Sequence, residues 1–160
     1  MSEPPEQRIK IDGPIVAIDD DESFRSELKE VFERRGIPAV FQESATHTMR
    51  YLQNQPWNWR PGLIITDIVM DGMGGYQLIR RINELYRGRK IPIIVLSRLN
   101  AGVDLGEAEV DGAAAYLTKP LNEAQLFKII AHITRPDPGP QEKKGMMVFT
   151  HEAGTRLLSR

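Results

Sequence analysis

The stretch Ile15-Val16-Ala17-Ile18-Asp19-Asp20-Asp21-Glu22 joins a short apolar run directly to four acidic residues. A continuous apolar run of this length is typical of a parallel strand that is buried on both faces. The pattern returns at residues 63–66, which precede Asp67, and at residues 91–96, which precede Ser97. Ligands bind at the carboxyl ends of the strands in open α/β sheets, so these polar side chains predict a binding crevice at that edge.

Segments with helical periodicity separate the apolar runs. The strands that we expect cover residues 14–18, 37–41, 63–66, 91–96 and 114–118. The helices that we expect carry the apolar stripes Phe24, Leu28, Val31, Phe32; Ala45, Met49, Leu52; Leu78, Ile79, Ile82, Leu85, Tyr86; and Leu121, Leu126, Ile129, Ile130, Ile133. Gly36 should end the first helix and Ser44 should cap the second, while Gly102 and Gly106 weaken a further helix over residues 103–110. Strands that alternate with helices in this way predict an α/β fold, doubly wound around a parallel sheet.

The length of 160 residues fits one compact domain with a short addition. We expect an N-terminal tail over residues 1–10 and a single domain over residues 11–134. Residues 135–140 contain three prolines and a glycine, a composition typical of a linker. The extension over residues 135–160 could be an arm that packs on this domain or on a second copy, the stub of a truncated output domain, or a disordered tail.

Net charge and composition argue against several classes of function. With a formal net charge of −1, the chain lacks the positive charge typical of proteins that bind nucleic acids or anionic membranes. No apolar run approaches the ~18 residues of a membrane span, and the first residues lack the layout of a signal peptide. The absence of cysteine is compatible with a reducing compartment. We therefore expect a cytoplasmic protein with no direct nucleic acid binding and no membrane association.

The carboxylates at the strand ends suggest a metal ion. Asp19 and Asp20, read alone, could simply cap the following helix. A parallel sheet also brings Asp67 close to them, and carboxylates gathered within a few ångströms raise each other's pKa unless a cation compensates. Mg²⁺, before Ca²⁺ or Mn²⁺, is the natural cation, and it typically binds one or two carboxylates, several waters and a phosphate oxygen. The site therefore predicts phosphate chemistry.

Four motifs together resemble the receiver domain of two-component response regulators. They are residues 15–22, 63–75, 93–97 and 111–120, in the order and at the spacing of that family over about residues 11–133. The resemblance implies a flavodoxin-like fold, with five parallel strands in the order 2-1-3-4-5 and five flanking helices. It also implies that Asp67 is the phosphoacceptor, and that Asp19, Asp20 and Asp67 bind Mg²⁺ together with the backbone carbonyl of Val69.

The same resemblance implies roles for residues around the acceptor. Lys119 would place its ammonium against a phosphoryl oxygen, and its bond to Pro120 is a candidate cis peptide. Ser97 would donate its hydroxyl to the phosphoryl group, and Tyr116 would be the aromatic residue that turns inward when that hydroxyl moves. Gly75 would close the turn after the acceptor. Without the family, Ser97 would be read as a turn residue and Tyr116 as a half-buried strand residue.

The resemblance further implies partners and an output. A sensor histidine kinase or a histidine phosphotransfer protein would supply the phosphoryl group from a phosphohistidine. The chain would catalyse only its own phosphorylation and dephosphorylation, so we do not expect an enzyme that acts on other substrates. The output would be read on the face formed by the fourth helix, fifth strand and fifth helix, and a homodimer could form through that 4-5-5 face or through the C-terminal arm.

Two residues depart from the family pattern. Asp71 stands where the family typically has proline, which adds a carboxylate near the metal site. Arg98 follows Ser97 where the family usually has a small residue. We expect Arg98 to cover or contact the phosphoryl group, and both residues to modulate the kinetics of phosphorylation.

Two other interpretations remain open on the sequence alone. Asp19 and Asp21 also resemble the paired aspartates of haloacid-dehalogenase-like phosphatases, a nucleophile and a general acid or base. That resemblance would make the chain a Mg²⁺-dependent hydrolase of small phosphates. The third interpretation is a receiver that acts only as a protein-binding module. Labelling by a phosphodonor distinguishes them, because it would modify Asp67, Asp19 or neither.

Overall fold

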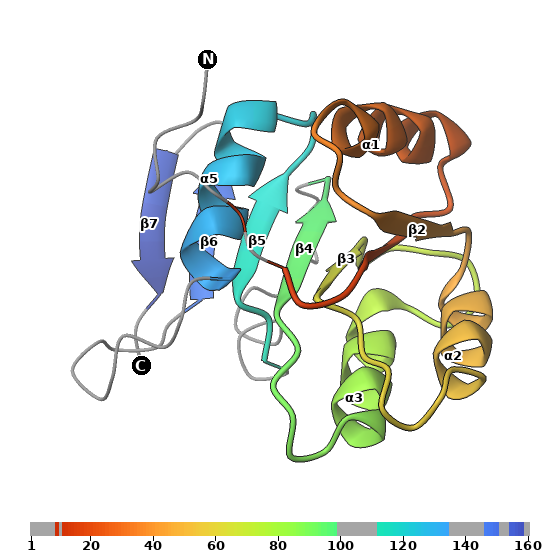
Figure 1. Ribbon diagram of the computed structural model, residues 1–160. Helices are drawn as coiled ribbons and strands as arrows, with labels where there is room; N and C mark the ends of the chain where they lie inside the picture. Colours follow the sequence, from red (N-terminus) through yellow and green to blue (C-terminus); the bar gives the residue numbers. More distant parts are fainter. Residues whose placement is uncertain (1–8, 10, 99–111, 135–145, 151–153, 159–160) are drawn as a thin grey trace.

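The computed structural model describes residues 9, 11–98, 112–134, 146–150 and 154–158, the last two segments by their backbone (Figure 1). Within these residues, all strands belong to one sheet in the order β2-β1-β3-β4-β5-β6-β7. The strands are β1 (Ile15–Ile18), β2 (Ala39–Gln42), β3 (Leu63–Thr66), β4 (Ile93–Ser97), β5 (Ala115–Thr118), β6 (Met146–Thr150) and β7 (Gly154–Leu158). The α/β prediction, with β1 to β5 parallel in the order 2-1-3-4-5, is confirmed.

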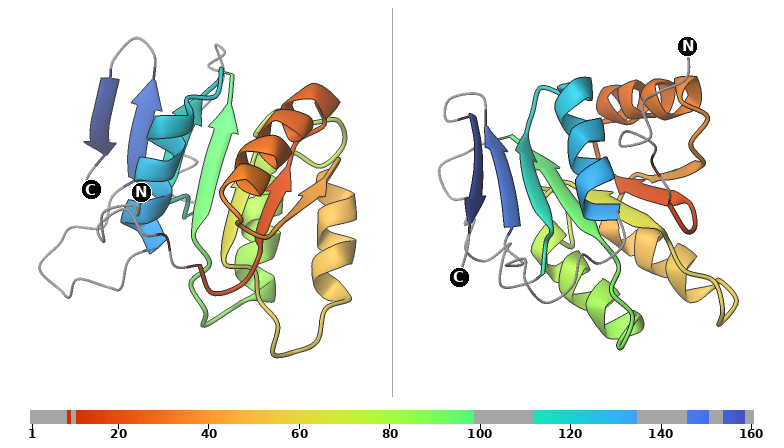
Figure 2. Two further views of the ribbon diagram at one scale, coloured as in Figure 1. Left: turned by 45° about the horizontal axis from the view of Figure 1, so that its top comes forward. Right: turned by 60° about the vertical axis from the view of Figure 1, so that its left-hand side comes forward.

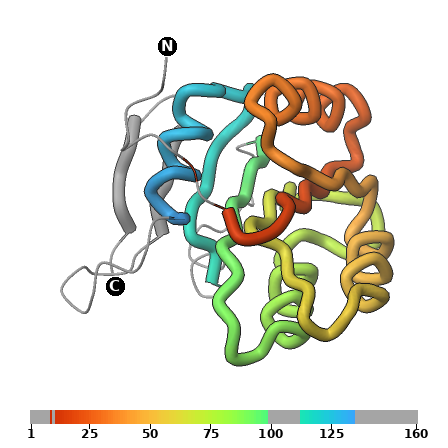
Figure 3. The backbone as a smooth tube through the Cα atoms, in the orientation of Figure 1, coloured from red at the N-terminus to blue at the C-terminus, as the bar shows by residue number. Residues whose placement is uncertain are grey.

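The central strands are mostly apolar, which suits a sheet with helices on both faces. Every residue of β1, β3, β4 and β5 is buried, whereas the edge strand β2 is only partly buried. The tube in Figure 3 shows the chain running from β1 through the first helix to the edge strand β2, and then returning to β3 at the centre. The strand order therefore reverses between β1 and β3.

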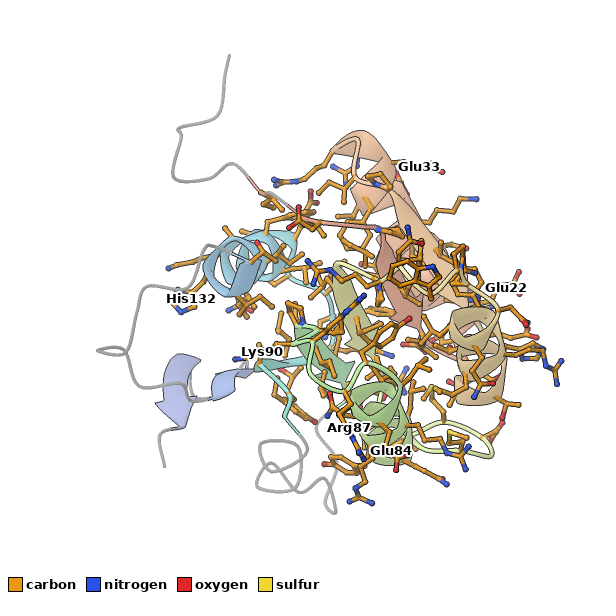
Figure 4. All side chains as sticks on the ribbon, turned by 60° about the horizontal axis from the view of Figure 1, so that its bottom comes forward. Glu22, Glu33, Glu84, Arg87, Lys90 and His132 are labelled. Carbon is orange, nitrogen blue, oxygen red and sulfur yellow. The ribbon has the colours of Figure 1, made fainter. Side chains whose placement is uncertain are left out.

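Four helices are described, and each sheet face carries two of them (Figure 2). They are α1 (Glu22–Arg34), α2 (Ala45–Gln53), α3 (Gly75–Leu85) and α5 (Glu123–Thr134). Helices α1 and α5 enclose one core cluster with the sheet, which includes Leu28, Phe32 and Ile129. Helices α2 and α3 enclose the other, which includes Met49 and Ile82. Polar side chains such as Glu22, Glu33, Glu84 and His132 lie on the outer faces of the helices (Figure 4).

The helix boundaries follow local signals in the sequence. Asp21 caps α1 by accepting hydrogen bonds from the backbone N–H groups of Ser23 and Phe24. Ser44 caps α2 through the N–H of His47, as expected, and Gly36 follows α1 with a φ of 66°. These residues satisfy N–H groups that have no partner within the helix, or adopt the left-handed conformation that glycine tolerates.

Two details of the predicted helical stripes are wrong, and one prediction falls outside the described part of the chain. Leu85 was placed on the buried stripe of α3, but it is 40% exposed because it is the last residue of that helix. Leu121 lies before α5 rather than within it. The helix expected over residues 103–110 lies outside the described residues. No described helix is long and apolar enough to cross a membrane.

The C-terminal extension contributes two strands to the sheet. Strand β6 pairs in parallel with β5, so that Val148 stands opposite Tyr116, and β7 pairs antiparallel with β6. The connection from β5 to β6 includes α5, as a parallel crossover requires. Figure 1 shows β6 and β7 side by side beyond β5. The sheet is therefore two strands longer than the five-stranded sheet expected from the sequence.

Candidate functional site

The expected site residues lie at the carboxyl ends of adjacent strands. Asp19 follows β1 directly, Asp67 follows β3, Ser97 ends β4 and Lys119 follows β5. The register aligns them, since Ile18 stands opposite Thr66 and Ser97 opposite Thr118. The site thus lies where the strand order reverses between β1 and β3, the position at which open α/β sheets bind ligands.

Lys119 joins the two buried carboxylates. Its Nζ atom lies 2.7 Å from Asp19 Oδ2 and 3.0 Å from Asp67 Oδ2, and its side chain is only 10% exposed. Burial lowers the pKa of Lys119, but the hydrogen bonds to Asp19 and Asp67 outweigh that effect and hold the pKa above its usual 10.5. The ammonium therefore stays charged at neutral pH. The peptide bond between Lys119 and Pro120 is cis, as expected.

Asp67 is surrounded by hydrogen-bond donors. Its Oδ1 accepts hydrogen bonds from the backbone N–H of Ile68 at 2.6 Å, the N–H of Val69 at 3.1 Å and the Ser97 hydroxyl at 2.5 Å. Lys119 donates to the other carboxylate oxygen, Oδ2. An ionised carboxylate can only accept hydrogen bonds, and each oxygen of Asp67 has at least one donor. The structure thus brings Asp67, Ser97 and Lys119 together as predicted.

Asp19 is the second buried carboxylate, at 2% exposed. Its Oδ1 accepts a hydrogen bond from the N–H of Asp21 at 2.9 Å, and its backbone carbonyl accepts one from the Arg25 guanidinium at 2.6 Å. Burial raises the pKa of Asp19 above its usual 3.8, the charge of Asp67 raises it further, and the hydrogen bond from Lys119 partly offsets both. Because Lys119 offsets the effect of burial only in part, a further cation beside Asp19 would stabilise its charged form.

The expected grouping of three carboxylates is only partly present. Asp20 is exposed, and among the residues that the structure describes no three carboxylate or imidazole side chains are close enough to hold one metal ion. Asp19 and Asp67 meet through Lys119 instead. Their donor chemistry nevertheless fits Mg²⁺, which needs only one or two carboxylates beside waters and phosphate oxygens. Val69, whose carbonyl was assigned to the metal, is 60% exposed beside the acceptor.

Tyr116 lies inside the sheet rather than half-buried at its surface. It is fully buried, and burial is the main cause that raises its pKa to about 12, with smaller contributions from Tyr76 and Asp67. Its hydroxyl lies near Ser97 but has no hydrogen-bond partner among the described residues. The aromatic ring, which was expected to turn inward when the Ser97 hydroxyl moves, is already inward in this structure.

The turn after the acceptor depends on Gly75. The N–H of Gly75 donates to the carbonyl of Ile68 at 2.9 Å, and a Cβ atom at Gly75 would lie 2.7 Å from Ile68 Cα. Only glycine therefore allows α3 to begin against the backbone of the acceptor. Asp71 and Arg98, the two residues that depart from the family pattern, are both exposed near this edge.

Two contacts of the site were not predicted. The Phe24 ring lies with its centroid 4.2 Å from Lys119 Nζ, and Arg25 holds the Asp19 carbonyl. Phe24 appeared in the sequence only as part of an apolar stripe. The only feature of the sequence that could have indicated these contacts is the position of both residues in the first turns of the helix that follows the acidic run.

Comparison with known proteins agrees with this geometry. The model of the response regulator receiver domain family matches residues 15–131. The Arabidopsis thaliana protein Two-component response regulator ARR15 is 27% identical over 128 residues, which cover 76% of this chain and 62% of that protein.

Solved structures give the same result. A response regulator receiver protein from Pseudomonas putida is 34% identical, with a TM-score of 0.62, covering 75% of this chain and 97% of that one. The chemotaxis protein CheY4 of Vibrio cholerae shares the fold, with a TM-score of 0.66 and 22% identity, over 76% of this chain and 98% of that one. The phosphatase interpretation would make Asp21 a general acid or base, whereas its carboxylate caps α1 in the structure. The chain therefore belongs to the response regulator receiver domain family of two-component systems.

Proposed function

We propose that the chain accepts a phosphoryl group on Asp67 from a phosphohistidine and thereby switches conformation. The observation that carries this proposal is the position of the Asp67 carboxylate between the Ser97 hydroxyl and the Lys119 ammonium. Receiver domains of two-component systems interact with histidine kinases. We infer that the donor is a sensor histidine kinase or a histidine phosphotransfer protein.

The reaction requires no general base, because carboxylates are already ionised near neutral pH. The Oδ2 atom of Asp67, which has Lys119 as its one partner among the described residues, attacks phosphorus. An O–P bond forms, the P–N bond to the histidine breaks, and its electron pair stays on the imidazole nitrogen, which takes a proton from the solvent as it leaves. The products are an aspartyl phosphate and neutral histidine.

The residues around Asp67 act by positioning and charge. Lys119 stabilises the negative charge on the phosphoryl oxygens during transfer, as cations do in other phosphoryl-transfer sites. Asp19, Asp20, Asp67 and the Val69 carbonyl would hold Mg²⁺, which neutralises further charge on the group when bound. Asp71 and Arg98 lie exposed at the same edge, where a carboxylate and a guanidinium can modulate the rate of transfer or hydrolysis.

We propose that the switch begins at Ser97. Its hydroxyl donates to Asp67 in the unphosphorylated chain, and it would donate to a phosphoryl oxygen after transfer. Tyr116 and strand β5 lie directly beside Ser97, so movement there would reach the 4-5-5 face. In the structure β6 pairs with the outer edge of β5, so a homodimer through that face would require β6 to leave β5. A cytoplasmic location, which the lack of cysteine fits, completes the proposal.

The test is labelling with acetyl phosphate and Mg²⁺, followed by mass spectrometry of the intact chain and its peptides. We expect one phosphoryl group on Asp67, none in Asp67→Asn, and slower labelling in Lys119→Gln and Asp20→Asn. Asp12→Asn is the matched control, since it removes an exposed carboxylate outside the site and leaves Asp67, Asp20 and Lys119 unchanged. Labelling on Asp19 would support a phosphatase, and no labelling would support a protein-binding module.

A further inference from the structure

The Lys119 ammonium has three donor protons and needs three partners when it is buried. Two are the carboxylates of Asp19 and Asp67. The third direction is occupied by the face of the Phe24 ring, whose centroid lies 4.2 Å from Nζ. That separation is well inside the limit of about 6 Å for a cation–π contact, and such contacts strengthen when water is excluded.

Phe24 is fixed in place independently of Lys119. Its backbone N–H donates to the Asp21 carboxylate at 3.3 Å, and its side chain is 7% exposed within the core cluster under α1 and α5. The neighbouring Arg25 holds the Asp19 carbonyl. The first turns of α1 thus contact both ends of the Asp19–Lys119 pair.

We propose that Phe24 is a positioning residue for Lys119, whose ring holds the ammonium in line with the two carboxylates. This inference rests on the proposed phosphoryl transfer to Asp67. A lysine side chain is flexible, and formation of the aspartyl phosphate exchanges one of its carboxylate partners for phosphoryl oxygens. The ring contact does not change during the reaction, so it keeps Lys119 directed at the acceptor before and after transfer.

The decisive variants are Phe24→Leu, which keeps an apolar side chain but removes the ring, and Phe24→Tyr, which keeps the ring face. Phe127→Leu is the matched control. Phe127 is 5% exposed in the same core cluster and also carries a cation on its ring, Arg35 at 3.6 Å, but it belongs to α5 rather than to the acceptor site. Both Leu variants therefore lose a buried ring, and only one loses the contact to Lys119.

Two measurements test the inference. The rate of acetyl phosphate labelling should fall about tenfold in Phe24→Leu, the effect of a cation–π contact worth about 1.4 kcal/mol, and should stay within about twofold of the wild type in Phe24→Tyr and Phe127→Leu. The Hε protons of Lys119 should resonate upfield in the wild type, Phe24→Tyr and Phe127→Leu, because the neighbouring Nζ atom lies over the ring, and should lose that shift in Phe24→Leu.

Several results would overturn the inference. They are an unchanged rate in Phe24→Leu, an equal loss of rate in Phe127→Leu, and an ordinary Hε shift in the wild type. If Phe24→Leu fails to fold, Phe24→Tyr must still keep both the wild-type labelling rate and the upfield shift of the Lys119 Hε protons. If the wild type is not labelled on Asp67 at all, the proposed function fails, and the Hε shift alone decides whether Phe24 positions Lys119.

Discussion

Two buried carboxylates share a single ammonium in this chain. Lys119 contacts both Asp19 and Asp67, which are 2% and 7% exposed, so two negative charges share one positive charge away from water. Removing one member of such a group leaves the others without compensation. The free energy of unfolding should therefore depend on the protonation of these residues, most clearly at Asp19.

Asp19 should destabilise the metal-free chain as pH rises. Because burial raises its pKa, the folded chain binds more protons at Asp19 than the unfolded chain does at pH values just above 3.8. The contribution of Asp19 to the free energy of unfolding therefore falls as pH increases through that range. Asp19→Asn should gain stability relative to the wild type between pH 3.5 and neutrality, measured as urea midpoints in a chelator.

An exposed aspartate provides the control for this pH dependence. Asp12 is exposed, and Asp12→Asn should keep a constant offset from the wild type across the same range. If the stability of Asp19→Asn relative to the wild type decreased as pH rose, the carboxylate would be stabilised by the fold, and our account of the Asp19 environment would be wrong.

Tyr116→Phe should stabilise the unphosphorylated chain. The Tyr116 hydroxyl is buried without a described partner, and such a group costs about 1–3 kcal/mol of desolvation. Removing it should raise the free energy of unfolding by about 1 kcal/mol in urea titrations. Tyr51→Phe, at a half-buried tyrosine of α2, should change it little. A loss of stability in Tyr116→Phe would mean that the hydroxyl has a partner in solution.

At the scale of elements, the turn from β3 to α3 sets the position of the acceptor. Gly75→Ala should destabilise the chain by about 1–3 kcal/mol, because its Cβ would overlap the backbone of Asp67 and Ile68. It should also slow labelling of Asp67. Gly74→Ala is the adjacent control, since its Cβ would meet only the Ile68 carbonyl at 3.5 Å, and it should cost at most about 1 kcal/mol. Equal effects would show that helix propensity, not the close approach, matters.

The sequence predicted the elements that carry the site because their signals are local. Buried strands appear as continuous apolar runs, and each run ends at a polar residue of the site, as at Asp67 and Ser97. The contacts of Phe24 and Arg25 were not predicted, because they depend on how α1 lies across the ends of β1 and β5. The solvent exposure of Asp20 could not be read from the sequence either, since adjacent aspartates look alike.

At the scale of the whole molecule, the extension changes which strand forms the edge of the sheet. Residues 146–149 are apolar, but nothing local in the sequence shows whether they pair with this chain or with another. Pairing with β5 depends on the long connection through α5, which determines where the extension can reach. Both core clusters that the described side chains form lie within residues 9–133.

The chain cut after Thr134 should therefore remain folded but lose protection in β5. Strand β6 pairs with Ala115, Tyr116 and Leu117, so removing it leaves the backbone groups on that side of β5 without partners. We expect faster amide hydrogen exchange in β5 and unchanged exchange in β3. A chain cut after Thr150, which keeps β6 and loses β7, is the intermediate case and should retain part of the protection.

Protein concentration distinguishes pairing within one chain from pairing between two. In the structure β6 belongs to the same chain as β5, so protection of β5 in the full chain should not change on dilution. If the arm instead crossed to a second copy, dilution would separate the copies and the exchange of Tyr116 and Leu117 would accelerate. Protection that falls on dilution, together with a dimer in sedimentation experiments, would contradict the intrachain pairing and support a homodimer joined by exchanged arms.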